Sequence, residues 1–233
     1  MKLTQDQIQE LYKFTRAHYV EHYDLQTELV DHLANGIEQQ WAHSPKLSFD
    51  EAKQMEFKKF GVFGFMDVVA ERQKAMGKKY RKIIWRFFMV WWSLPKLIFA
   101  ISSIFILFVI IDALPKGDLR FETICGVFFA LALLLLYRTF QLKKVINGAP
   151  KKWMLQEMIY RQGLTVQLFL IPLHFSNMAN LRGLLDTFHG QLFIATLVVI
   201  MLILLKICGY AIPSKAEELL VETYPEYKIE KDL

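Results

Sequence analysis

Residues 193–205 read FIATLVVIMLILL, and this run predicts a helix that crosses a membrane. A helix needs about 20 mostly apolar residues to span the hydrocarbon core of a bilayer. The uncharged stretch from Thr187 to Leu205 has that length, and the 233-residue chain is 54% hydrophobic as a whole. The sequence therefore indicates an integral membrane protein, and the other apolar runs decide how often it crosses.

Three further runs are candidate spans. Lys96 and Asp112 lie near the ends of the run 94–114, where charged side chains can reach the lipid headgroups. The run 123–137 has 15 uncharged residues and needs its flanks to span. The third run is uncharged but carries polar or kinking residues that suit a bundle interior or a substrate path, namely Gln167, Pro172, His174 and Asn177. We predict a four-helix transmembrane bundle within residues 94–212, with spans at 94–114, 121–140, 162–181 and 187–209.

The distribution of charge predicts the orientation. Residues 81–233 carry 17 Lys/Arg against 11 Asp/Glu, and their basic residues flank the apolar runs. Six basic residues precede the first span and six lie between the second and third, whereas the other two loops hold two and one. Basic loops stay in the cytoplasm. We therefore expect a bacterial inner-membrane protein with both termini cytoplasmic, in contact with membrane lipid and not with nucleic acid.

Two further features bear on the compartment and on the chemistry. The first ten residues lack the apolar segment of a secretory signal, so the N-terminal part is expected to stay in the cytoplasm. Cys125 and Cys208 lie inside apolar runs, so neither a disulfide nor a cysteine metal site is expected. Residues 81–93 are basic and rich in tryptophan, which predicts an interfacial lead-in to the first span, with a site for a specific lipid as the alternative.

Residues 1–80 have an ordinary soluble charge balance and predict a small helical head. Capping-box patterns start at Thr4 and at Ser48. The periodicity predicts a first helix that runs through His22, a turn around Tyr23, and a second helix capped by Asp24. A third helix is expected over 49–60, ending at Gly61, and a fourth from about residue 65. The fold class is thus all-α: a small cytoplasmic helical bundle followed by the transmembrane bundle.

The acidic residues 213–233 form a cytoplasmic tail in this interpretation. A capping-box pattern runs from Ser214 to Glu217 and predicts a short helix. The tail either contacts the basic loop between the second and third spans or is solvated, and the solvated tail is the favoured reading.

Two stretches of the head carry a resemblance to a known family. YDLQTELVDHLANGIEQQW (23–41) and SFDEAKQMEFKKFG (48–61) contain an acidic-His-Leu step, a Ser-x-x-Glu-Ala start and a Phe-Gly end. Over roughly residues 8–75 the chain resembles the HAAS, or permease-prefix, domain of bacterial membrane proteins, although FGVFGF stands where that family often has Phe-Gly-Asp-Pro. The resemblance implies a cytoplasmic protein-docking module, since some relatives are paired with transcriptional regulators and others are fused to transporters. The implied docking residues are Asp31, His32, Phe60 and Gly61.

HYVEH, residues 18–22, has the H-x-x-E-H form of inverted zinc metalloproteases. Such a protease needs a distant third ligand and a substrate chamber, and a head of 80 residues offers little room for either. A smaller hypothesis is a structural or sensory metal site made of His18, His22 and His32, with Asp31 or Glu28 nearby. The favoured alternative is that His32 packs within the helix hairpin while the other two histidines face water.

The predicted function follows from this organisation. No phosphate loop, nucleophile elbow or carboxylate pair is visible, so neither an enzyme nor a cofactor is expected. We predict a regulatory membrane protein whose head docks a cytoplasmic or membrane protein and is coupled to the four spans. The alternative is a small oligomeric transporter or channel component that uses the polar third span, and a homo-oligomer is left open.

Overall fold

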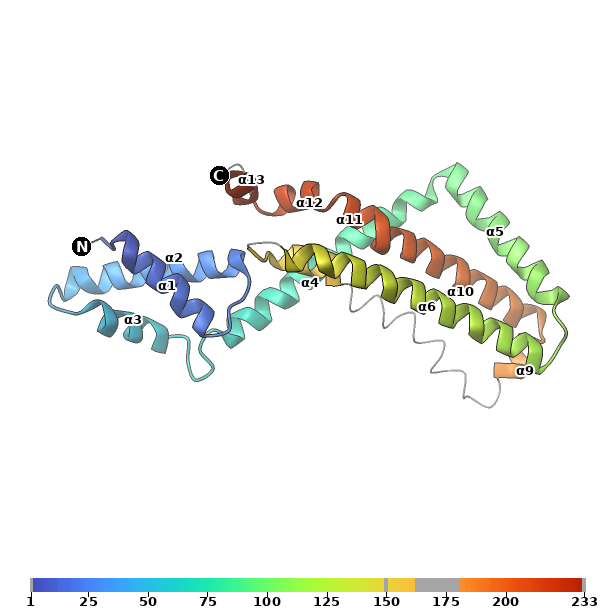
Figure 1. Ribbon diagram of the computed structural model, residues 1–233, viewed down its shortest axis with the longest axis horizontal. Helices are drawn as coiled ribbons and strands as arrows, with labels where there is room; N and C mark the ends of the chain where they lie inside the picture. The colour runs from blue at the N-terminus through green and yellow to red at the C-terminus, as the bar shows by residue number, and fades with distance from the viewer. Residues whose placement is uncertain (1, 149–150, 162–180, 232–233) are drawn as a thin grey trace. The chain divides into compact units, whose positions relative to one another are not determined.

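The computed structural model describes residues 2–148, 151–161 and 181–231, and in these ranges every regular element is a helix (Figure 1). The chain divides into two compact units. The first, which we call the head, consists of Met1–Lys79 together with Ala149–Glu157. The second, the membrane unit, consists of Tyr80–Gly148 and Met158–Leu233. A segment from the middle of the sequence therefore belongs to the N-terminal head.

The head is built on an antiparallel pair of helices, α1 (Gln5–Ala17) and α2 (Tyr23–His43). Leu3 N donates to Glu38 at 3.0 Å at one end, and Tyr12 Oη donates to Thr27 at 3.2 Å near the other. The helix α3 (Phe49–Lys58) packs on α2. Both predicted capping boxes, at Thr4 and at Ser48, are formed. Apolar side chains from these helices and from Phe65 make the buried core: Leu11, Leu25, Leu29, Leu33, Ile37, Ala52 and Phe65.

The turn between α1 and α2 differs from the prediction. The helix α1 ends at Ala17, Tyr19 adopts a left-handed φ of 64°, and His22 already precedes the first residue of α2. The Gln26 side chain donates to Val20 O at 2.6 Å and holds the turn. A left-handed residue ends an α-helix, so His18 and His22 are not one turn apart on a helix. The predicted first helix through His22 was wrong.

The third and fourth helices are joined by a glycine turn. The helix α3 ends at Lys58, two residues before the predicted end, and Gly61 and Gly64 have left-handed φ values of 81° and 55°. The helix α4 (Met66–Met89) begins in the head and continues into the membrane unit. It is followed by a 3₁₀ turn over Val90–Trp92. The predicted lead-in 81–93 is thus the end of a long helix and a single tight turn.

Three helices of the membrane unit are long and apolar enough to cross a bilayer: Leu94–Ala113, Asp118–Lys144 and Phe188–Ser214. They correspond to α5 (Leu94–Ala113), α6 (Asp118–Asn147) and α10 (Phe188–Lys206), the last extended by a π turn (Ile207–Ala211) and α11 (Ile212–Ser214). Their shared core includes Ile111, Phe128, Leu135, Ile194 and Val198. The predicted spans at 94–114, 121–140 and 187–209 coincide with these helices, whereas 162–181 lies almost wholly outside the described residues. The described part of the chain therefore has the character of a multi-pass membrane protein.

Arg120 ties the ends of the membrane helices together. This residue lies in the first turn of α6 and is only 1% exposed. Its guanidinium donates to Asp112 O, Leu114 O and Leu185 O at 3.0, 2.6 and 3.2 Å, and lies 3.3 Å from Asp186 Oδ1. Carbonyl groups at the end of a helix lack partners within that helix. The sequence reading counted Arg120 only as a loop charge, whereas the structure makes it a buried cap.

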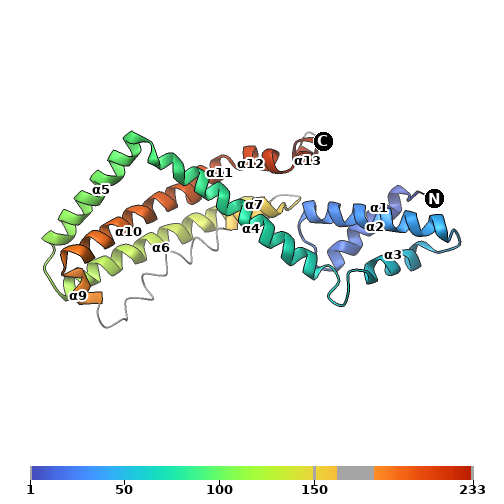
Figure 2. The same cartoon turned by 180° about the vertical axis from the view of Figure 1, so that it is seen from behind.

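The C-terminal residues are packed, which corrects the favoured reading of a solvated tail. Figure 2 shows α12 (Ala216–Thr223) and α13 (Glu226–Lys231) following α11. Leu219, Leu220 and Tyr224 are buried. Glu222 accepts two hydrogen bonds from Arg86 of α4, at 3.1 and 3.2 Å. The predicted capping box at Ser214 is also wrong, because its hydroxyl donates back to Ala211 O.

Gly190, in the first turn of α10, packs closely against Leu184 of α9 (Leu181–Leu185), which allows the contact between these two helices to be tested. A methyl group on Gly190 would lie 1.8 Å from the backbone oxygen of Leu184, which no side-chain rotation relieves. We expect Gly190→Ala to destabilise the membrane unit by about 1–3 kcal/mol or more, measured as a lower melting temperature of the full chain in detergent. Gly183→Ala is the matched control, because no described atom lies within 4 Å of its added methyl group. Equal melting temperatures for the two variants would contradict the close contact.

Candidate functional site

The turn between α1 and α2 holds a segment from more than 120 residues further along the chain. Tyr23 N donates to Lys152 O at 2.8 Å, Met154 N donates to Asp24 Oδ1 at 3.2 Å, and His22 Nε2 donates to Glu157 Oε2 at 2.8 Å. All of these residues belong to the head. We call this arrangement, made of residues 22–24 and 151–157, the clasp.

Asp24 has a different role from the one predicted. It was expected to cap α2, but α2 already begins at Tyr23, and the Asp24 carboxylate instead accepts from the first backbone N–H of α7 (Met154–Arg161). The first N–H groups of a helix have no partner within it, and a negative charge there is also favoured by the helix dipole. Asp24 therefore stabilises the start of a helix that it meets only in the folded head.

The ion pair of the clasp is shielded from water. The side chains of His22 and Glu157 are 10% and 15% exposed. A polar group in such a place loses its hydration and depends on its protein partner, so removing the Glu157 side chain takes from His22 the partner of its Nε2. By contrast, Lys152 and Glu21 pair across the clasp at 3.7 Å with side chains 42% and 65% exposed, and such a pair contributes little.

Aromatic packing adds apolar contact to these polar bonds. The Trp153 ring meets Tyr23 edge to face, with ring centroids 5.3 Å apart, and Lys151 Nζ lies 4.2 Å from the centroid of the same tyrosine. Trp153 and its neighbours Met154 and Leu155 are buried. Edge-to-face rings and cation–π contacts each contribute about 0.5–1.5 kcal/mol. The clasp thus joins hydrogen bonds, an ion pair and ring contacts in one place, and these hold residues 151–157 in the head.

The structure does not bring the three candidate metal ligands together. His18 donates through Nδ1 to Phe14 O at 2.8 Å and packs on Phe14 and Phe57. His22 turns to Glu157, and His32 lies against Phe60 with ring centroids 5.4 Å apart. Among the described residues no group of three such side chains could hold a metal ion. The alternative reading fails as well, because His22 is buried and His32 is exposed.

Two of the candidate docking residues, His32 and Phe60, are in contact in the head. His32 of α2 contacts Phe60, and Phe60 packs on the buried Phe65 at 4.8 Å between ring centroids. Gly61 opens the turn that follows, and Asp31 is exposed on α2. Within this turn Val62 is 97% exposed and Phe63 70% exposed. We call residues 60–63 the apolar loop.

The apolar loop and the clasp were not predicted from the sequence, and the polar residues of the predicted third span lie outside the described residues. The exposed apolar pair had a signal, because Val62 and Phe63 stand between two glycines in FGVFGF. The clasp had only a weak sequence signal, namely that the basic loop containing Lys151 and Lys152 is expected on the same side of the membrane as the head. The polar residues of the predicted third span, Gln167, Pro172, His174 and Asn177, fall outside the described residues.

Comparisons of the chain with protein-family models, with curated proteins and with solved structures gave no match.

The His22–Glu157 pair can be tested by hydrogen exchange in the full chain in detergent. We expect Glu157→Ala to lower the free energy of local opening at the Met154 amide by about 1–3 kcal/mol, because His22 would lose its buried partner. The matched control is Glu21→Ala, which removes the exposed partner of Lys152 and should change the same quantity by less than about 1 kcal/mol. Unchanged protection in Glu157→Ala would show that the pair does not hold the segment.

Proposed function

We propose that this membrane protein is a regulatory protein of the bacterial inner membrane whose cytoplasmic head docks another protein and is coupled to the membrane helices through the clasp. The observation that carries the proposal is the inclusion of residues 149–157 in the head. A head that only tethered a partner would need no contact with residues 151–157, which follow α6.

The clasp supports the predicted sidedness of this part of the chain. The head precedes α5, and residues 151–157 follow α6. If α5 and α6 each cross the bilayer once, the chain returns to the side from which it started, as the clasp requires. The many basic residues of that loop and of the segment before α5 favour the cytoplasm for this side.

The apolar loop supports docking of a protein. Val62 and Phe63 place large apolar side chains in water, next to the pair of rings formed by His32 and Phe60. Exposed aromatic and aliphatic groups side by side favour a protein interface, because burying them against a partner removes apolar surface from water. The loop begins at the Phe-Gly step of the HAAS resemblance, whereas Val62 and Phe63 stand where that family often has Asp-Pro. A partner with an apolar pocket fits this surface.

Two helices offer routes for coupling. The helix α4 runs without interruption from Met66 in the head to Met89 in the membrane unit. The helix α7 begins in the clasp at Met154 and ends in the membrane unit at Arg161. Docking that shifts the head would therefore act on the membrane unit through two helical connections.

Co-purification of the full chain in mild detergent tests the docking function. We expect Phe63→Ser to reduce recovery of a specific partner at least about tenfold, since central aromatic residues often contribute 2 kcal/mol or more to an interface. Met55→Ser is the control, because Met55 of α3 is 51% exposed and lies outside the apolar loop. Recovery of the same partners at the same level by Phe63→Ser would contradict docking at this surface.

A further inference from the structure

A hollow of about 560 Å³ opens in the head beside the clasp. It lies between the end of α1, the turn before α2 and the start of the clasp segment, and its lining residues are Gln9, Tyr12, Arg16, Val20, Glu21, Tyr23, Gln26, Lys151 and Lys152. All of them belong to the head. Sites for small molecules usually measure about 300–1,000 Å³, so this hollow is large enough for a nucleotide.

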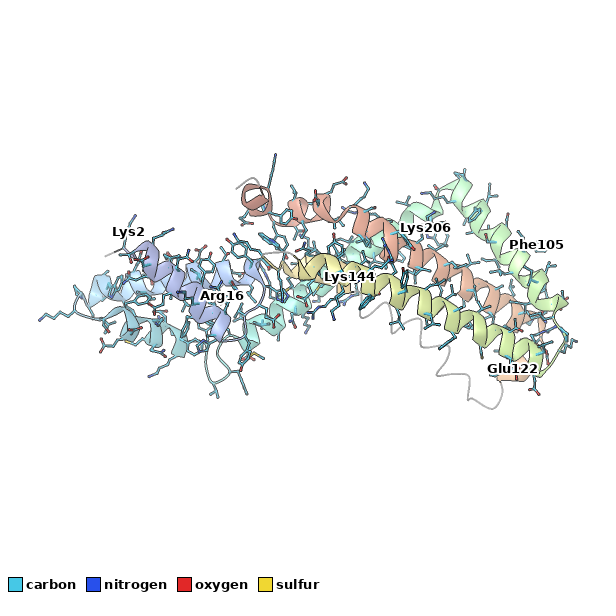
Figure 3. The ribbon with its side chains drawn as sticks, in the orientation of Figure 1. Lys2, Arg16, Phe105, Glu122, Lys144 and Lys206 are labelled. Carbon is cyan, nitrogen blue, oxygen red and sulfur yellow. The ribbon has the colours of Figure 1, made fainter. Side chains whose placement is uncertain are left out.

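The charged groups that line the hollow favour an anion. Arg16, Lys151 and Lys152 line it together with a single carboxylate, Glu21. Arg16 is exposed on α1 (Figure 3). Within the described ranges no carboxylate pairs with it. Lys152 pairs with Glu21 at 3.7 Å, and because both side chains are exposed this pair contributes little. A guanidinium with its donors available beside two ammonium groups matches the oxygens of a phosphate.

Two tyrosines complete the lining. The rings of Tyr12 and Tyr23 are nearly parallel, with an interplanar angle of 9° and centroids 6.1 Å apart. Gln9 and Gln26 also line the hollow, and the Gln26 amide donates to Val20 O. Flat rings next to cations suit a ligand with a planar or sugar-like part attached to a phosphate, because such a ligand pairs its charge at one end and packs at the other.

We propose that this hollow binds a phosphate-bearing anion of nucleotide size. The phosphate contacts Arg16 on one side and Lys151 and Lys152 on the other, so the ligand joins α1 to the clasp segment. Its binding stabilises the clasp by mass action, because the site exists only while residues 151–157 are held in the head. This regulatory consequence rests on the proposed function, whereas the binding itself does not.

Binding is tested by isothermal titration of the full chain in detergent, with ATP, inorganic triphosphate and dioctanoyl phosphatidic acid as separate probes. We expect saturable ATP binding with a Kd below about 1 mM, and Arg16→Gln and Lys152→Gln each weaken it at least about tenfold. Lys13→Gln is the control, since Lys13 is exposed on α1 and does not line the hollow. Unchanged melting temperatures of the ligand-free variants show that they fold.

The outcomes separate the possible sources of the phosphate. Absence of saturable binding with every probe, or equal weakening by Lys13→Gln, overturns the site. Binding of phosphatidic acid in preference to ATP and triphosphate overturns the nucleotide and assigns the phosphate to a lipid headgroup. ATP binding that survives in Phe63→Ser while partner recovery is lost separates this site from the docking surface. ATP should also slow hydrogen exchange at residues 151–157, and exchange unaffected by saturating ATP overturns the link to the clasp.

Discussion

The hydrogen bonds of Tyr23 and Asp24 with residues 152 and 154 constrain the rest of the chain. They fix one end of the segment after α6 to the helix hairpin that precedes α4. The chain between these two points, which includes α5 and α6, must therefore leave the head and return to it. A membrane protein with an independent head carries no such constraint, because its soluble and apolar parts meet at a single point in the chain.

The two units are stabilised by different combinations of apolar and polar contacts. In the head, capped helices bury an aliphatic core, and the clasp adds polar bonds that depend on exclusion of water. In the membrane unit, α5, α6 and α10 share an apolar core, and Arg120 supplies hydrogen bonds at one end of it. Backbone carbonyls at helix ends need partners where water is scarce, and one guanidinium serves three of them.

Local patterns predicted the helical architecture, and non-local contacts escaped prediction. The capping boxes at Thr4 and Ser48 and the apolar runs are short-range signals, and the helices follow them. The end of α1 was missed because Tyr19, a bulky residue, takes the left-handed conformation that glycine usually marks. The clasp was missed because periodicity carries no information about which residues meet after 130 positions. Arg120 was misjudged because its charge suggests exposure, whereas burial depends on the three carbonyls that surround it.

The clasp also sets an order of events during synthesis. Residues 1–79 leave the ribosome first, and domains generally fold as their chain emerges. Residues 151–157, however, are made only after both α5 and α6, so the head lacks Trp153 and the partners of His22 and Asp24 until then. Completion of the head therefore follows the synthesis of the first two apolar helices within the same molecule.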